Sequence, residues 1–195
     1  MIDWLESIDQ QLVLAINGWN SPFLDEFMWI ISGKITWIPL YLILICLGFV
    51  RLGWKKALLY IGCVLLAVGV TDFICSGIIK ELVQRYRPSH NLELIHQLHF
   101  YRTETGTLYQ GGQYGFVSSH AGNFFALSWM VGWVLKPYFR WLLPVLLILT
   151  VIICYSRMYL GVHYLSDILG GALIGTGVAL LVYRMVYLKV NQYIS

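Results

Sequence analysis

Long apolar runs separated by short charged segments make up most of the chain after residue 34. A helix needs roughly 20 apolar residues to cross the hydrocarbon core of a bilayer, and these runs with their flanks approach that length. The pattern therefore predicts an all-α, polytopic membrane helix bundle of five to six spans. The clear runs are residues 35–50, 57–79, 124–135 with its flanks, 141–155 and 168–186.

The residues before the first run follow a different pattern. Apolar side chains alternate there with the acids Asp3, Glu6 and Asp9 at roughly helical spacing, which is typical of an amphipathic helix lying in the membrane interface. The sequence thus predicts an interfacial or partly spanning segment over residues 1–34 and the helix bundle over residues 35–195. The length leaves room for a single domain, residues 1–195.

Composition agrees with a lipid environment and excludes several other classes. Only 12% of the residues are charged, against about 25% in soluble domains, and 58% are hydrophobic. The formal net charge of +3 is small and scattered, so no nucleic-acid partner is expected. The four cysteines stand singly in apolar runs without a metal-ligand pair and are interpreted as packing residues.

The distribution of basic residues predicts the orientation of the bundle. Lysine and arginine are retained on the cytoplasmic side of a membrane, and seven of the 13 basic residues follow the first, third and fifth runs. Three of the other six, Lys80, Arg87 and Arg157, belong to the sequence motifs described below, and discounting them leaves a bias of seven to three. The opposite ends, including the long polar segment of residues 85–117, are therefore expected outside the cytoplasm.

Polar residues form three clusters at the ends of the spans, and the alternation of the spans places all three on the same side. Ionisable groups near a membrane are costly and usually functional. Their coincidence at one depth predicts a shared polar site. The clusters are residues 80–88, residues 118–120, and residues 156–157 together with 163–167.

Spacing inside two clusters gives each a chemical interpretation. Lys80 and Arg87 are seven residues apart, so both are expected on one face of a helix that Pro88 ends. His163 and Asp167 are four apart, which also predicts a shared helix face. There the carboxylate can hold one imidazole nitrogen and leave the other as a nucleophile.

The remaining cluster suits an anion. Ser118 and Ser119 stand where the N-cap of the third span is expected, so backbone N–H groups of its first turn can point at an anion with His120 directly behind. Guanidinium groups such as that of Arg157 match phosphate oxygens in pairs. Three cations, helix-end amides and two histidines together favour a phosphoryl group.

Three motifs in the sequence follow a known order. They are K-x6-R-P at Lys80, Arg87 and Pro88; a P-S-G-H pattern read at Val117, Ser118, Ser119 and His120; and S-R-x5-H-x3-D at Ser156, Arg157, His163 and Asp167. Together they resemble the type 2 phosphatidic acid phosphatase superfamily of integral-membrane lipid phosphate phosphatases. The departures are Val117 for proline and Ser119 for glycine.

The resemblance implies a role for each matched residue. His163 would be the nucleophile that forms a phosphohistidine, Asp167 would orient it, and His120 would protonate the leaving oxygen and then activate water. No metal and no cofactor are implied, because cations occupy the place of a magnesium ion. The implied phosphate-binding residues are Lys80, Arg87, Ser118, Ser119 and Arg157.

Several functions remain open under this resemblance. The favoured substrate is undecaprenyl diphosphate, because the compact chain resembles small bacterial members. Phosphatidylglycerol phosphate, phosphatidic acid and phosphorylated lipid A are alternatives, as are a haloperoxidase-like oxidation and a lipid transporter or scaffold without turnover. The expected location is a bacterial inner (cytoplasmic) membrane, with the active site facing the periplasm or cell exterior, and the partners are a membrane lipid phosphate and the bilayer. The oligomeric state is left open.

Features outside the motifs carry weaker expectations. His90, His96 and His99 are interpreted as structural loop residues, and Asp72 inside the second span either makes a structural hydrogen bond or supports the site. Residues 88–117 are predicted to form an outer loop over the site. Long connections are often functional, and this one is either a lid that touches the headgroup or an ordinary surface loop.

Overall fold

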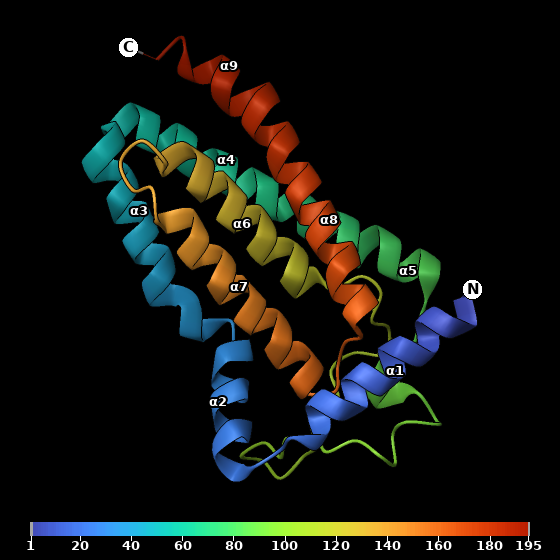
Figure 1. Cartoon of the computed structure of the whole chain (residues 1–195). Helices are drawn as coiled ribbons and strands as arrows, with labels where there is room; N and C mark the ends of the chain where they lie inside the picture. Colours follow the sequence, from blue (N-terminus) through green and yellow to red (C-terminus); the bar gives the residue numbers. More distant parts are fainter. Residues whose placement is uncertain (1, 195) are drawn as a thin grey trace.

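Helices and connecting segments make up residues 2–194, the part of the chain that the computed structural model describes (Figure 1). A π-helical stretch, Phe73–Ile79, joins α4 to α5 without a break, and another, Tyr183–Tyr187, joins α8 to α9. The helices are α1 (Ile2–Gly18), α2 (Pro22–Ser32), α3 (Ile38–Leu52), α4 (Trp54–Asp72), α5 (Lys80–Val83), α6 (Ser119–Leu135), α7 (Leu142–Tyr159), α8 (Leu165–Val182) and α9 (Leu188–Asn191).

Four of these helical stretches are long and apolar enough to cross a membrane. The 17-residue α6 packs among them against α4, α7 and α8, and is within the range of spanning lengths. The prediction of an all-α membrane bundle is confirmed. The helices are longer than the apolar runs in the sequence, because several residues of the motifs belong to the helices as well. The four stretches are Ile35–Leu52, Trp54–Val83, Leu142–Tyr159 and Leu165–Asn191.

Small residues allow α6 and α8 to approach closely. A Cβ atom added to Gly175 of α8 would lie 2.1 Å from the carbonyl oxygen of Gly122 in α6, and one added to Gly171 would lie 2.2 Å from the carbonyl oxygen of Ser118. In a bilayer, where hydrophobic burial gives little driving force between helices, such close contacts provide much of the packing. This contact fixes the first turn of α6 relative to α8.

Gly175→Ala is therefore expected to destabilise the fold by about 1–3 kcal/mol or more, because the methyl group meets a backbone carbonyl that cannot move aside. The matched control is Gly177→Ala on the same helix, where an added Cβ has no atom within 4 Å. Thermal unfolding of the detergent-solubilised variants measures the difference. Equal melting temperatures for the two variants would contradict the packing argument.

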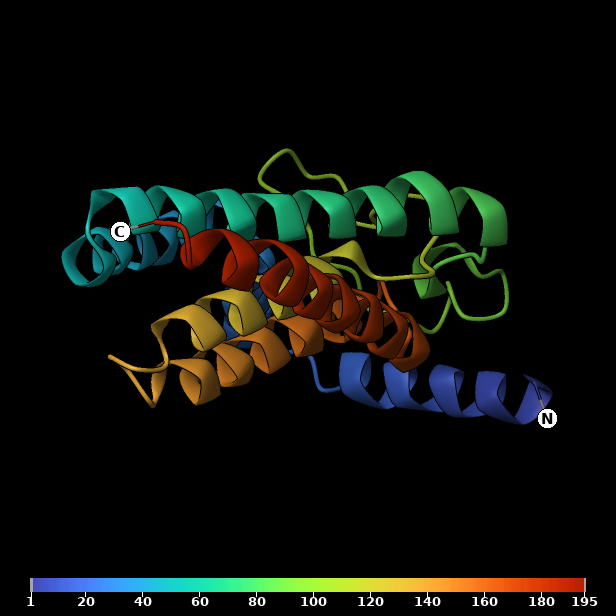
Figure 2. The same ribbon diagram turned by 90° about the horizontal axis from the view of Figure 1, so that it is seen from above.

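Outside the main bundle, α1 and α2 lie at the end of the molecule opposite α9 (Figure 1). Seen from above, α1 runs along one side of the bundle (Figure 2), where it packs against α7 and α8. Val13 of α1 is fully buried, whereas Trp4 is 65% exposed. The predicted N-terminal segment thus contains two helices, α1 and α2, and α1 lies with one face on the bundle. The connection between α5 and α6 lies at this same end of the molecule.

Asp72, the acid inside the second span, makes a structural contact. The side-chain amide of Asn123 in α6 donates to its Oδ1 over 2.8 Å. The hydrogen bond ties α4 to α6 one turn below the start of α6. This observation favours the structural interpretation of Asp72.

Candidate active site

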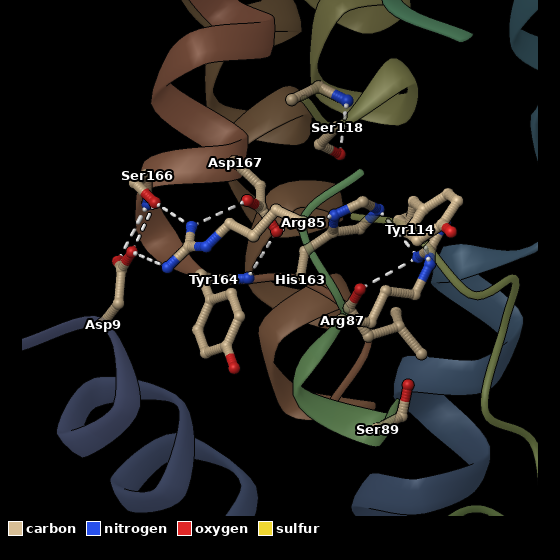
Figure 3. Close-up of polar contacts among 12 residues, drawn as sticks. Asp9, Arg85, Arg87, Ser89, Tyr114, Ser118, His163, Tyr164, Ser166 and Asp167 are labelled. Carbon is tan, nitrogen blue, oxygen red and sulfur yellow. Dashed lines mark hydrogen bonds and ion pairs between the residues drawn. The ribbon is translucent and has the colours of Figure 1, made fainter. Parts of the chain in front are cut away.

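The structure brings the three sequence clusters together at the end of the bundle where α1 and the α5–α6 connection lie (Figure 3). His163 lies in the turn between α7 and α8, and Arg157 lies in the last turn of α7. Arg87 comes from the segment after α5, and Ser118 is the N-cap of α6. The alternation of the spans therefore predicted the meeting of the motifs.

His163 and Asp167 form a buried pair. Nδ1 of His163 lies 3.3 Å from Oδ2 of Asp167, and the ring is 1% exposed. The spacing predicted that the two residues share a helix face. They do not, because His163 precedes α8. Asp167 instead folds back over the first turn of α8, where its Oδ2 accepts the N–H of Tyr164 over 3.0 Å. Helix capping, and not helical periodicity, positions the carboxylate beside the imidazole.

Arg87 occupies the other side of the same ring. Its Nη1 lies 3.0 Å from His163 Nε2 and donates to the carbonyl oxygen of Val162 over 2.9 Å, while its Nε donates to the carbonyl oxygen of Tyr114 over 3.0 Å. A guanidinium group only donates hydrogen bonds, so Nε2 must accept with its lone pair. The proton of the neutral ring is consequently on Nδ1, facing Asp167.

Lys80 and Arg87 do not lie on one helix, and this prediction was wrong. The helix ends at Val83, because Gln84 adopts a left-handed conformation with φ of 49°. Arg87 is extended (φ −66°, ψ 159°), as expected for a residue that precedes proline. The chain turns at Gln84 and still brings Arg87 within electrostatic range of Lys80.

Arg157 is held by the α2 end of the molecule. Its Nη1 donates to Ser32 Oγ and its Nη2 donates to the hydroxyl of Tyr109 over 3.0 Å. The side chain is buried, and its Nε has no hydrogen-bond partner among the described residues. A buried N–H without a partner is costly, so this group is suited to bind an oxygen of a ligand.

The first turn of α6 provides backbone donors. Ser118 is fully buried, its N–H donates to the carbonyl oxygen of Asp167 over 2.9 Å, and its Oγ accepts from Ala121 N–H over 3.4 Å. The N–H groups of Ser119 and His120, in the first turn, have no carbonyl partner within the helix. Ser118 therefore acts as the predicted N-cap, and the two following amides are the ones that can bind an anion.

Electrostatics favour an anion in this site. Arg87 lies close enough to Lys80 and Arg157 for their like charges to repel, and Arg157 acts in the same way on the His120 ring. An anion bound among these groups would relieve the repulsion. Burial, reinforced by Arg87 and Arg157, holds the pKa of His163 well below its ordinary value. The ring is therefore neutral at neutral pH and keeps the lone pair that a nucleophile requires.

Four charged or polar residues of the site were given no role by the sequence analysis, although two of them, Arg85 and Ser166, lie within its polar clusters. Lys34 lies within electrostatic range of His120, and Asp9, Arg85 and Ser166 form a network beside Asp167. Asp9 was assigned to the polar face of the first helix but is only 4% exposed. The available signal was the helical spacing of the apolar residues Leu12, Val13 and Ile16, at i+3, i+4 and i+7 from Asp9, which places this acid on the apolar face.

The predicted outer loop contacts both α2 and the site. Tyr101 stacks on Trp29 of α2 with ring centroids 4.6 Å apart, and its hydroxyl donates to the Glu26 carboxylate over 3.0 Å. Through Tyr109 and the Tyr114 carbonyl, the loop also binds two of the cationic side chains. His99 Nε2 lies 2.9 Å from Asp25 Oδ2, which supports a structural role for this histidine.

Comparison with known proteins agrees with the motifs. Residues 56–191 match the model of the PAP2 superfamily. The chain belongs to the PAP2 superfamily. It is a lipid phosphatase that crosses the membrane several times, as the family and the spans together show.

Individual PAP2 relatives resemble most of the chain. The lipid A 4′-phosphatase of Bacteroides thetaiotaomicron is 35% identical over 175 residues, which cover 90% of this chain and 75% of the relative. The lipid A 4′-phosphatase of Porphyromonas gingivalis is 33% identical over 185 residues, covering 94% and 75%. Among solved structures, the transmembrane PAP2 type phosphatidylglycerolphosphate phosphatase of Bacillus subtilis superposes with a TM-score of 0.70 at 22% identity, covering 97% of this chain and 87% of that one.

Proposed function

We propose that this phosphatase removes a phosphate group from a membrane lipid through a phosphohistidine on His163. The observation that carries the proposal is the geometry of the buried His163 ring, whose Nδ1 lies 3.3 Å from Asp167 Oδ2 and whose Nε2 lies 3.0 Å from Arg87 Nη1. This geometry places the ring proton on Nδ1 and the lone pair on Nε2. Binding alone requires cations but no nucleophile with an orienting carboxylate. The arrangement therefore favours turnover over a transporter or scaffold.

The reaction runs in two displacements. The Nε2 lone pair of His163 attacks phosphorus, the bond from phosphorus to the lipid oxygen breaks, and His120 gives that oxygen a proton. His120 then takes a proton from water as the water oxygen attacks phosphorus and the P–N bond breaks. Phosphate and the free histidine result, and both imidazoles return to their starting protonation states.

The cations hold the phosphoryl oxygens during both steps. Lys80, Arg87 and Arg157 lie within electrostatic range of His163. With the amides of Ser119 and His120 they can hold the equatorial oxygens, over which charge is spread in the transition state. Arg87 now donates to Nε2 itself, so the phosphate must draw this guanidinium from the nitrogen to its own oxygens. Substrate binding thereby frees the nucleophile.

Because these cations perform the charge neutralisation, activity is expected without a metal or cofactor. Phosphate release should be unchanged in the presence of a chelator and unchanged by added magnesium. The measurement is the rate of phosphate release by the purified protein, with the zinc and magnesium contents of the protein determined in parallel. A rate that falls with the chelator and returns with magnesium would contradict the proposal.

For the substrate, we propose the 4′-phosphate of lipid A. Two relatives that carry this activity in their names share 35% and 33% identity with the chain over nearly its whole length. Undecaprenyl diphosphate, which the sequence analysis favoured, stays a prediction. Phosphatidylglycerol phosphate and phosphatidic acid are further candidates.

A panel of the four lipids in matched vesicles tests the substrate. We expect the highest kcat/KM for lipid A, with slower release from the other three. A clear preference for undecaprenyl diphosphate would instead support the compact-chain argument. No release from any lipid or from a soluble phosphate ester would contradict the proposed function as a whole.

The proposed location is a bacterial inner membrane with the site on the periplasmic or outer side. The bias of basic residues toward the ends that follow the first, third and fifth spans supports this orientation. Lys136 and Arg140 lie between α6 and α7, at the end of these helices away from the site. A lipid headgroup in the outer leaflet would then reach the site at the level of α1.

A further inference from the structure

A second polar network lies behind the catalytic pair, on the side of Asp167 away from Arg87 (Figure 3). Oδ2 of Asp167 faces His163, and Oδ1 accepts from Arg85 Nη1 over 3.1 Å. Arg85 Nη2 donates to Asp9 Oδ2 over 3.0 Å. One guanidinium group thus bridges the carboxylate of the catalytic pair and a carboxylate of α1.

Ser166 closes this network. Its Oγ accepts from Arg85 Nη1 over 2.6 Å and donates to Asp9 Oδ2, and its backbone N–H donates to Asp9 Oδ1 over 3.0 Å. The Arg85 guanidinium also lies over the Tyr164 ring, 4.2 Å from the centroid, a favourable cation–π distance. Both oxygens of Asp9 and two nitrogens of Arg85 are therefore committed to fixed partners.

The two carboxylates of the network are buried, whereas its guanidinium group is partly exposed to the surroundings. Asp167 is fully buried and Asp9 is 4% exposed, whereas the Arg85 side chain is 23% exposed. A buried carboxylate without a cation is costly, and a guanidinium group at hydrogen-bond distance favours the ionised form. Among the residues that the structure describes, Arg85 is the arginine whose side chain hydrogen-bonds Asp167 directly.

We propose that Arg85 and Asp9 are positioning residues for the reaction. Arg85 holds Asp167 ionised and in the orientation that keeps the His163 proton on Nδ1, and Asp9 holds Arg85. Neither residue touches the phosphate. The inference rests on the proposed function, in which His163 attacks phosphorus, and it assigns to α1 a part in the active site that the sequence motifs do not include.

The main test is kinetic. Asp9→Asn is nearly isosteric, removes the charge and replaces one acceptor oxygen with an N–H₂ donor that cannot accept from Arg85 or Ser166. It is expected to lower kcat by about 10- to 100-fold, by analogy with the loss of an outer partner of a metal-bound histidine. KM should change little, because the phosphate-binding side chains stay in place. The matched control is Glu6→Gln, which removes an exposed charge from the same helix and should keep the wild-type kcat.

Arg85 variants separate charge from geometry. Arg85→Lys keeps the charge but cannot bridge two carboxylates with a planar fork, so it should recover part of the kcat that Arg85→Met loses. If Asp9→Asn does not yield folded protein, Ser166→Ala replaces it, because this change removes the hydroxyl that joins Arg85 to Asp9. Wild-type kcat in folded Arg85→Met would overturn the proposal.

A double-mutant cycle distinguishes positioning from support of the fold. If Asp9 acts through Asp167, Asp9→Asn should have almost no further effect in an Asp167→Asn background. The same fold-loss of kcat in both backgrounds would overturn the proposal. Melting temperatures of all four proteins are measured alongside the rates.

A spectroscopic readout tests positioning without turnover. Nitrogen NMR of histidine-labelled protein reports the tautomer of His163, whose signal is assigned by its loss in His163→Gln. The Nδ1–H tautomer is expected in the wild type, with a greater Nε2–H share in Asp9→Asn and no change in Glu6→Gln. An unchanged tautomer in Asp9→Asn would overturn the positioning role. Wild-type protein that releases no phosphate, yet shows the expected shift in Asp9→Asn, would refute the proposed function and leave the positioning role standing.

Discussion

His163→Ala is expected to lower lipid dephosphorylation by at least about 10⁴-fold, the scale of loss when a covalent enzyme loses its nucleophile. The variant should still bind phosphate and vanadate, because the cationic side chains of Lys80, Arg87 and Arg157 are unchanged. Vanadate is informative since it adopts the trigonal-bipyramidal geometry of the transition state. Phosphate release gives the rate, and calorimetry gives the affinity.

The matched control for this prediction is His96→Ala, which removes an exposed histidine of the outer loop and should leave the rate near that of the wild type. Substantial turnover by His163→Ala would rule out the phosphohistidine. If His163→Ala loses both turnover and vanadate binding, the ring is needed to organise the cations. The two measurements thus separate chemistry from binding.

His120→Ala is expected to slow reactions with poor leaving groups far more than reactions with good ones. A lipid alkoxide is basic and needs the proton from His120, so the first step should fall by about 10²- to 10⁴-fold. Nitrophenolate leaves without a proton, so nitrophenyl phosphate should still phosphorylate His163 and give a burst of nitrophenol. Rapid-mixing measurements separate this burst from the slower hydrolysis that follows.

Equal losses in the first step for both substrates would count against His120 as the general acid. The absence of a burst with nitrophenyl phosphate would also contradict this role. Retention of the burst together with slow hydrolysis would support both roles, since the same ring activates water in the second step.

The general architecture followed from the sequence because a bilayer requires long uncharged helices. The apolar runs located all of the spans, and their alternation placed Lys80, His120 and His163 at one end. Helix bounds were less well predicted. Arg157 and Asp167 lie outside the predicted apolar runs but inside α7 and α8. A charged residue can continue a helix when its side chain finds a partner in the site.

The finer geometry of the site depended on conformations that residue spacing does not encode. The turn at Gln84 places Lys80 and Arg87 on different segments. The sequence did not indicate this turn, because a spacing of seven residues is also compatible with one continuous helix. Asp9 was interpreted as solvent-facing because an acid in an amphipathic helix usually faces water. Its burial required Arg85, a residue 76 positions away in the sequence, and such a partnership is visible only after folding.

The position of Asp9 has a practical consequence for how this enzyme is handled. The same helix α1 presents Trp4 to the surroundings and Asp9 to the network behind Asp167. An amphiphile that keeps α1 packed on the bundle should preserve this carboxylate, whereas a detergent that displaces α1 should remove it from the network. Specific activity should therefore vary with the solubilising agent and recover on transfer to nanodiscs, and purification tags are better placed at the C-terminus than beside α1.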